Sequence, residues 1–197
     1  EHVINNIQKI MSEPDTVHHE VSSEPDTATS RKPKCTDFFD PALTPETTTI
    51  YPELGAKINS IEIQDTQGNK VNILTPRKNY KIIFHGEFHQ GFEKIHFGIH
   101  IKSVSGAVVS GQRYPEEGKY ITIENPGIFS ISYSFDMNLL PGTYFIGGGI
   151  WSTVDSTCPH RILDAIMFRV TSTSSQASFG YCDLMSSPAE FDFHNLQ

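Results

Sequence analysis

The sequence has few cysteines, little positive charge and no long apolar run, and each shortage excludes a class of protein. Its three cysteines, Cys35, Cys158 and Cys182, lack the close spacing of a disulfide framework or zinc knuckle, so we expect a reducing compartment. With 15 Lys and Arg against 23 Asp and Glu, and a net charge of −8, the chain lacks the clustered basic residues that bind nucleic acid or anionic lipid. No apolar stretch approaches the ~20 residues of a membrane-spanning helix, and no signal peptide opens the sequence. We expect a soluble, acidic, cytoplasmic protein.

Common catalytic motifs are missing as well. There is no Gly-x-Ser-x-Gly elbow, no His-Glu-x-x-His and no calcium-binding loop. The stretch from Gly111 to Lys119 superficially resembles a phosphate-binding loop. However, six residues instead of four separate its glycines, and Tyr120 stands where a magnesium-binding Ser or Thr is needed. We therefore predict no catalytic residue and no cofactor.

Four histidines, His85, His89, His96 and His100, crowd two predicted strands, and clustered imidazoles raise the question of a metal. Residues four apart on a strand lie ~13 Å from each other, so neither same-strand pair can share an ion. A site would need a cross-strand pair, such as His85 with His100, and a third ligand. We therefore predict no metal site, and histidines that hydrogen-bond hydroxyl groups instead.

Residues 1–35 differ in composition from the rest. Apolar residues recur at helical spacing up to Met11, which predicts a short helix. Ser, Thr, Pro, Glu and Asp then dominate, and Ser-Glu-Pro-Asp-Thr occurs twice, so we predict a flexible acidic linker. Residues 36–197 are predicted to form one β-domain. Because the sequence opens on Glu1 rather than Met, we expect it to be a piece of a longer protein.

From about Thr36, short runs of alternating apolar and polar residues are separated by turn signals such as Asn125-Pro126-Gly127 and Pro141-Gly142. No helical pattern of 10–15 residues lies between them, which excludes a parallel α/β sheet. This rhythm predicts an all-β fold, an immunoglobulin-like or jelly-roll antiparallel β-sandwich. The predicted strands are 57–64, 70–74, 79–88, 94–103, 119–124, 128–136, 143–151, 164–172, 178–184 and 190–194.

Alternation assigns each strand an apolar and a polar face. Along 94–103, for example, Ile95, Phe97 and Ile99 point one way, while His96 and His100 point the other. The second face of the protein therefore carries His, Glu, Lys, Arg, Ser and Gly residues together with the single Trp.

The stretch from Gly147 to Trp151 suggests a binding surface on that polar face. Successive glycines in a strand often admit a ligand, and an indole offers a flat apolar platform for a sugar ring. The equally weighted alternative is that the glycines make room for packing and that Trp151 is buried. Lys102 and Arg169 are a candidate pair for a phosphate or carboxylate terminus. The predicted carbohydrate-binding residues are Trp151, His85, Glu87, His96, His100, Lys102, Gly147, Gly149 and Arg169.

Several stretches, in this order and spacing, resemble the Wzt C-terminal domain family over about residues 36–197. They are Thr36-Asp37-Phe38-Phe39-Asp40-Pro41, Tyr51-Pro52-Glu53-Leu54-Gly55-Ala56-Lys57-Ile58, Asp65-Thr66-Gln67-Gly68, Phe97-Gly98-Ile99-His100-Ile101-Lys102, Leu139-Leu140-Pro141-Gly142-Thr143-Tyr144, and Asp164 followed by Phe168-Arg169-Val170.

The resemblance implies a non-catalytic module that recognises the non-reducing terminus of an O-antigen polysaccharide. In that family the module belongs to the ATP-binding subunit of an ABC transporter, at the cytoplasmic side of the Gram-negative inner membrane. The ATPase half, which would contact the membrane subunit, is absent from this sequence. The resemblance further implies a homodimer, with exchange of a C-terminal strand at 190–194 in some members.

Two other functions remain open. One is a small β-sandwich enzyme acting on glycans through Glu87 and a histidine. The other is an interaction module that dimerises through its sheet edges and binds no sugar.

Overall fold

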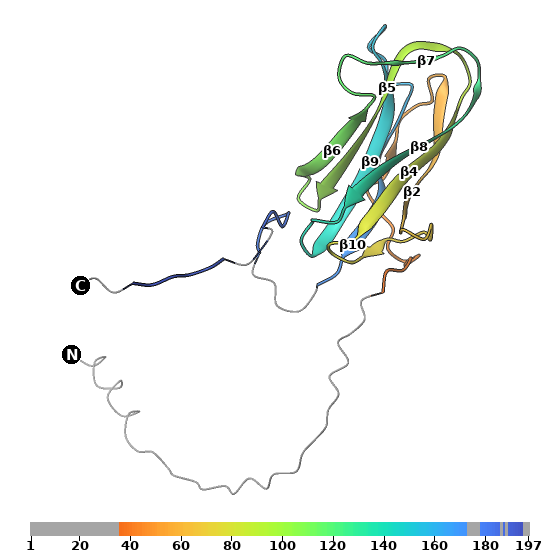
Figure 1. Cartoon of the computed structure of the whole chain (residues 1–197). Helices are drawn as coiled ribbons and strands as arrows, with labels where there is room; N and C mark the ends of the chain where they lie inside the picture. The colour runs from red at the N-terminus through yellow and green to blue at the C-terminus, as the bar shows by residue number, and fades with distance from the viewer. Residues whose placement is uncertain (1–35, 173–177, 186, 188, 195–197) are drawn as a thin grey trace, which may run out of the picture. The chain divides into compact units, whose positions relative to one another are not determined.

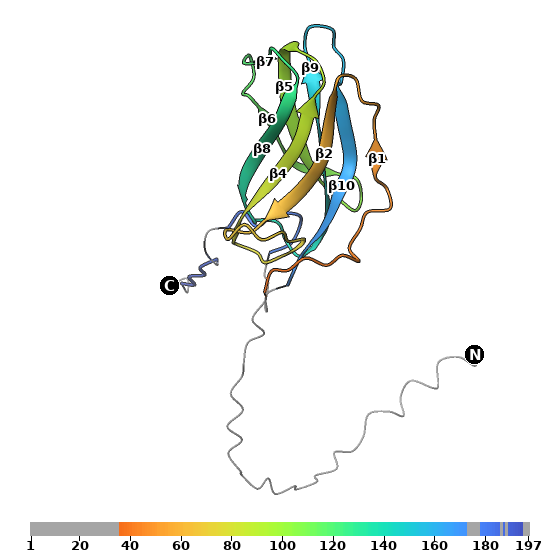
Figure 2. The ribbon, with the colours of Figure 1, turned by 90° about the vertical axis from the view of Figure 1, so that its right-hand side faces the viewer.

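The computed structural model describes residues 36–172, 178–185, 187 and 189–194, in which the chain forms ten strands and no helix (Figure 1). The described part of the chain accordingly contains no apolar helix of membrane-spanning length. Two sheets pack face to face, and Figure 2 shows the smaller one, with β2, β4 and β8, in front of the larger one. The all-β sandwich predicted from the sequence is confirmed. The predicted helix and linker of residues 1–35 lie outside the described residues.

The larger sheet has five strands in the order β1 (Thr49–Ile50), β10 (His160–Val170), β9 (Gly142–Ser152), β5 (Phe92–Ser103) and β6 (Val108–Tyr114). Two short strands extend it, β3 (Ile73–Leu74) beside β10 and β7 (Ile121–Ile123) beside β5. The smaller sheet has the order β2 (Ala56–Gln64), β4 (Asn79–Phe88) and β8 (Gly127–Asp136). All pairs are antiparallel except β3 with β10.

The core lies between the two sheets and follows the predicted alternation. On β5 the buried side chains include Ile95 and Phe97, and on β4 they include Ile82 and Phe84. The apolar side of β8 is covered less completely: Tyr133 is buried, whereas Phe129, Ile131 and Phe135 are only partly buried. This difference arises because β8 is the last strand of the smaller sheet.

One long side of the sandwich is closed and the other is open. On the closed side, β2 and β10 contact each other, and the buried His160 accepts a hydrogen bond from the backbone N–H of Ile58 at its Nδ1, 2.9 Å away. Burial lowers the pKa of His160, which keeps the imidazole neutral for this role. On the open side, β8 faces β6 and β7 across a groove.

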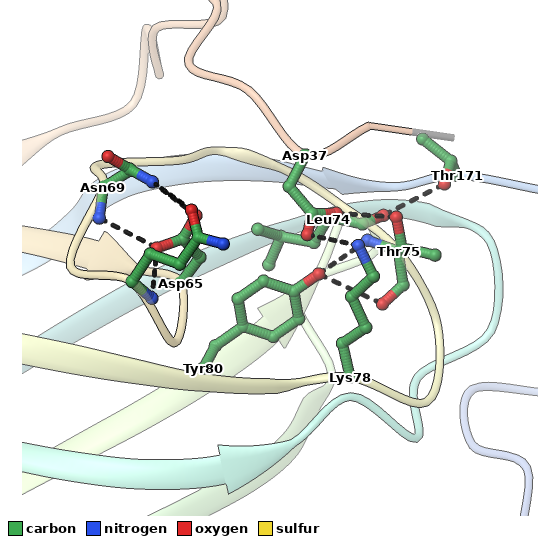
Figure 3. A network of polar contacts seen from close by, with 9 residues as sticks. Asp37, Asp65, Asn69, Leu74, Thr75, Lys78, Tyr80 and Thr171 are labelled. Atoms are coloured by element: carbon green, nitrogen blue, oxygen red, sulfur yellow. Dashed lines mark hydrogen bonds and ion pairs between the residues drawn. The ribbon is translucent and has the colours of Figure 1, made fainter. Parts of the chain in front are cut away.

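The end of the sandwich where the described chain begins is fixed by a polar network (Figure 3). The carboxylate of Asp37 accepts hydrogen bonds from the Thr75 hydroxyl at 2.6 Å and from Lys78 Nζ at 2.7 Å. The Tyr80 hydroxyl accepts one from the backbone N–H of Thr75 at 2.9 Å. These contacts hold the segment that enters the domain against the start of β4.

Several strand predictions are wrong. Residues 70–74 form only the short β3 and an isolated bridge from Lys70 to Gln64, and 178–184 contribute only an isolated bridge between Leu139 and Cys182. Residues 190–194 are described but form no strand. Conversely, β6 was not predicted, because its Ser, Gly, Gln and Arg residues show no apolar alternation. Its inner side lies beyond the edge of the smaller sheet, so it does not need apolar residues.

Candidate functional site

The predicted site residues do not lie on one surface. His85 and Glu87 are on β4, on the outer face of the smaller sheet. The others lie on the outer face of the larger sheet, on the opposite side of the core: His96, His100, Lys102, Gly147, Gly149, Trp151 and Arg169. The prediction combined them because alternation assigns an outer side to each strand but does not say to which sheet the strand belongs.

Trp151 is half-buried at the centre of a row of stacked side chains. It pairs across β9 and β5 with His96, and the two rings stack with centroids 5.6 Å apart and planes 14° from parallel. On the other side of β9, the guanidinium carbon of Arg161 lies 5.8 Å from the indole centroid. The same carbon lies 5.5 Å from the ring of Tyr51, which follows β1.

The row continues beyond β5 to the edge of the sheet. Arg113 on β6 pairs with Gly98 of β5, and its guanidinium carbon lies 5.6 Å from the ring of Tyr120. Burial, and secondarily the charge of Arg113, lower the pKa of His96. We call these six residues the aromatic–cation row: Tyr120, Arg113, His96, Trp151, Arg161 and Tyr51. They are brought together only by the register of β6, β5, β9 and β10.

The space next to the glycines beneath the row is filled by the protein's own side chains. A Cβ at Gly98 would lie 2.7 Å from the Trp151 ring, one at Gly147 would lie 2.8 Å from the His100 ring, and one at Gly149 would lie 3.1 Å from the Arg161 side chain. A sugar ring at Gly147 or Gly149 would therefore have to displace the His100 or the Arg161 side chain. The alternative of glycines that make room for packing fits this structure.

The indole of Trp151 has a close side-chain neighbour on each adjacent strand. His96 from β5 and Arg161 from β10 lie over the ring from the two strands that flank β9. A sugar that stacks on the indole, as predicted, would share the ring with these two neighbours. The row brings together indole N–H, imidazole, phenol and guanidinium groups, all of which can hydrogen-bond.

Lys102 is engaged within the protein. Its Nζ lies 2.7 Å from Asp164 Oδ1, and Asp164 Oδ2 accepts a hydrogen bond from the Thr47 hydroxyl at 2.9 Å. Asp164 lies where the β9–β10 register shifts, with a φ of 50°. An anionic ligand at Lys102, as predicted, would therefore compete with Asp164.

His100 and Arg169, two further predicted site residues, lie apart from the ring contacts of the row. Burial, followed by the charges of Arg161 and Lys102, lowers the pKa of His100. Arg169 is exposed and pairs with Thr143 of β9, whereas Arg161 pairs with Gly149, six residues further along β9. At about 3.3 Å per residue this separates the two arginine Cα atoms by ~20 Å.

Among the residues that the structure describes, the arginines of the row lack carboxylate partners. In the described residues, no Asp or Glu oxygen lies within 4.0 Å of a nitrogen of Arg113 or Arg161. Buried nitrogens without a hydrogen-bond partner include Arg113 Nε and Nη2, Arg161 Nε and His96 Nδ1. Sequence reasoning missed both arginines and both tyrosines, because only the cross-strand register aligns them with Trp151. Among the described residues, no three His, Cys, Asp or Glu side chains gather closely enough to hold a metal ion.

A second feature is the groove of about 600 Å³ on the open side of the sandwich. Its lining combines aromatic side chains with the serines of β8: Phe88, Phe97, Phe129, Tyr133, Ser130, Ser132 and Ser134. The buried Tyr133 hydroxyl has no hydrogen-bond partner within the described part of the chain, and burial raises its pKa. The groove therefore combines an apolar wall, an unpaired hydroxyl and the free edge of β8.

Solved structures with related folds include a crystal structure of the C-terminal domain of Wzt, which matches with a TM-score of 0.66 and 24% identity over 76% of this chain and 92% of that chain. A β-glucuronidase from Bacteroides uniformis, bound to cyclophellitol-6-carboxylate aziridine, matches with a TM-score of 0.39 and 10% identity over 53% of this chain and 13% of that chain. A Niemann-Pick type C2 protein from the Japanese carpenter ant matches with a TM-score of 0.40 and 7% identity over 61% of this chain and 98% of that chain. The first match shows the fold, and the other two are too distant to indicate a fold or a function.

No curated protein matches the sequence significantly. The model of the Wzt C-terminal domain family, in contrast, matches residues 47–184, well over half of the chain. The match includes every strand of the sandwich and all six residues of the aromatic–cation row. The chain therefore belongs to the Wzt C-terminal domain family, the non-catalytic carbohydrate-binding module of the O-antigen ABC transporter ATPase.

Proposed function

We propose that this chain recognises the non-reducing terminus of an O-antigen polysaccharide through the aromatic–cation row, so that the transporter exports the finished glycan. Membership of the family supports the class of ligand. The observation that carries the site is the row itself, in which aromatic rings lie against two arginines that have no carboxylate partner among the described residues.

The row has dimensions suited to the end of a sugar chain. From β6 to β10 it crosses three strand spacings of about 4.8 Å, or ~14 Å, and Tyr51 extends it further. Its outward edges donate hydrogen bonds that sugar oxygens accept, and its ring edges contact the apolar sides of a sugar. The residues bind and orient the glycan, and no bond is made or broken.

In this proposal the chain acts at the cytoplasmic side of a Gram-negative inner membrane, next to the ATPase domain of the same transporter. The ATPase domain would connect it to the membrane subunit and supply the energy of transport. The support for this placement is the family match, since the Wzt ATPase is a cytoplasmic protein.

We also propose that two copies form a homodimer in which residues 190–194 of one copy pair with β8 of the other. Phe191 and Phe193 alternate along this segment and are 86% and 72% exposed, which is unfavourable unless a partner covers them. The free edge of β8 and the apolar groove beside it provide a matching surface.

The binding proposal is tested by calorimetric titration of the full chain with the O-polysaccharide of its source bacterium, intact and after removal of the terminal modification. We expect binding of the intact form only. Trp151→Ala should weaken it at least tenfold, because the indole positions both His96 and Arg161. The matched control is His85→Ala on the other sheet, which should change affinity by less than twofold.

The same titration separates the other two functions. Release of shorter oligosaccharides that stops with Glu87→Gln would establish the enzyme. Absence of binding by the wild-type chain, with an intact fold, would leave only the interaction module.

A further inference from the structure

We infer that the aromatic–cation row selects glycans bearing a negatively charged substituent, a carboxylate or phosphate group, which Arg113 and Arg161 hold. This inference rests on the proposed function and specifies its ligand. It arises from three features of the row: the balance of donors and acceptors, the geometry of the unpaired nitrogens, and the uncompensated charge.

The row is rich in donors and contains neither carboxylates nor amides. Arg113, Arg161 and Trp151 can only donate hydrogen bonds, whereas Tyr51, Tyr120 and His96 can donate or accept. A neutral sugar hydroxyl both donates and accepts, so it is best satisfied where donors and acceptors alternate. An ionised carboxylate accepts only, and a phosphate ester is likewise dominated by acceptor oxygens. The row therefore complements an acceptor-rich group.

The unpaired nitrogens of Arg113 form a geometry that fits such a group. Its Nε and Nη2 lie on one edge of the guanidinium and point in parallel, and both are buried without a partner. This fork matches two oxygens of one carboxylate or phosphate. The ring of Tyr120 lies against the face of the guanidinium and is 43% exposed, which leaves the ring able to move when a ligand enters at the fork. Arg161, with an unpaired Nε, would contact the other side of the bound sugar.

The charge of both arginines is uncompensated, which contrasts with Lys102 on the same face. Lys102 is neutralised by Asp164 at 2.7 Å. Arg113 and Arg161 instead lie against aromatic rings, which orient a guanidinium without cancelling its charge. In a protein of net charge −8 this leaves a local positive field for an anionic ligand.

The test uses the full wild-type chain and three forms of the O-polysaccharide purified from the source bacterium. One form is untreated, one has its carboxylates reduced to alcohols with carbodiimide and borohydride, and one has its phosphate esters removed with hydrofluoric acid. We expect one treatment to weaken binding at least tenfold, and the effective treatment identifies the anion. Raising the salt concentration should weaken binding of the untreated form more than that of the affected form.

Variants then assign the effect to residues. Arg113→Gln and Arg161→Gln should each weaken binding of the untreated polysaccharide at least tenfold. The treatment that weakens binding by the wild-type chain should then change the affinity of these variants little. Arg161→Lys should retain part of the affinity, because it keeps the charge but loses the planar fork. The matched control is Arg169→Gln, which removes the same charge from the same sheet ~20 Å away.

Each result is decisive. If the untreated polysaccharide binds and both treatments leave its affinity within twofold, the inference is overturned while the proposed function stands. If Arg169→Gln costs as much as the row variants, general surface charge replaces the row as the explanation. If the untreated polysaccharide does not bind, the proposed function fails and the inference fails with it. The treatments act on the ligand, so they decide the question even where a variant does not fold.

Discussion

At the scale of single residues, the glycines of β9 serve the fold rather than the ligand. Gly148 points into the core, where a Cβ would lie 2.5 Å from the Gly98 carbonyl oxygen and 2.5 Å from the Phe84 ring. Gly148→Ala must therefore displace β5 or Phe84. We expect the free energy of unfolding to fall by about 1–3 kcal/mol, measured by urea denaturation.

Gly127 offers the matched control. A Cβ there would meet no atom within 4 Å, so Gly127→Ala should leave the free energy of unfolding unchanged or raise it by up to about 1 kcal/mol. Equal losses in the two variants would show that close packing around Gly148 is not the cause.

The polar residues could be predicted only in part. Alternation correctly placed His96, His100 and Trp151 on a polar side of their strands. It could not show that His96 and Arg161 cover the indole, because those contacts depend on which residues face each other across strands. The same limit hid Arg113 until β6 was aligned with β5.

At the scale of elements, the register shift in β10 is held by a mostly buried ion pair. The Lys102 and Asp164 side chains are 23% and 10% exposed, so Lys102→Met would leave a carboxylate without its cation in a largely dry place. We expect a loss of about 1–3 kcal/mol in the free energy of unfolding, measured by chemical denaturation.

A second substitution distinguishes loss of the pair from loss of packing. Asn tolerates the positive φ of residue 164 and carries no charge, so adding Asp164→Asn to Lys102→Met should recover part of the lost stability. If the double variant is as unstable as the sum of the two single variants, the charges are not coupled.

Strands were predictable where alternation reflects burial on one side. The 79–88 strand was predicted with the bounds that β4 has, and 128–136 differs from β8 by one residue. Residues 190–194 also alternate but have no neighbouring strand within the described monomer. Strand β6 does the opposite: it pairs fully with β5 and lacks apolar alternation. Alternation therefore measures burial, and hydrogen-bonded pairing is a separate property.

At the scale of the whole molecule, the open side of the sandwich leads to a prediction about assembly. Sedimentation velocity of the full chain should show a dimer, and the double variant Phe191→Ser with Phe193→Ser should sediment as a monomer, because it removes the apolar residues that would fill the groove. Phe179→Ser is the control, since Phe179 is also exposed but lies outside the segment. A dimer that persists in the double variant would contradict the proposed strand exchange.

The assignment of strands to sheets is what the sequence could not supply. Each strand of a sandwich has one buried and one outer side, whichever sheet it joins, so alternation looks the same in both. His85 and Glu87 were therefore grouped with Trp151 although the core separates them. Sheet membership depends on long-range pairing, such as β5 with β9, which local sequence does not encode.

The glycines beneath the row, Gly98, Gly147 and Gly149, have a consequence for protein engineering. The side chains of the row pack directly on the backbone of these glycines, and the hydrophobic core lies on the opposite face of the same strands. A library randomised at residues 51, 113, 120 and 161 would thus vary the recognition surface while the interior stays constant. Specificity and foldability are separable in this scaffold, so binders for new polysaccharides can be selected from it without redesigning its core.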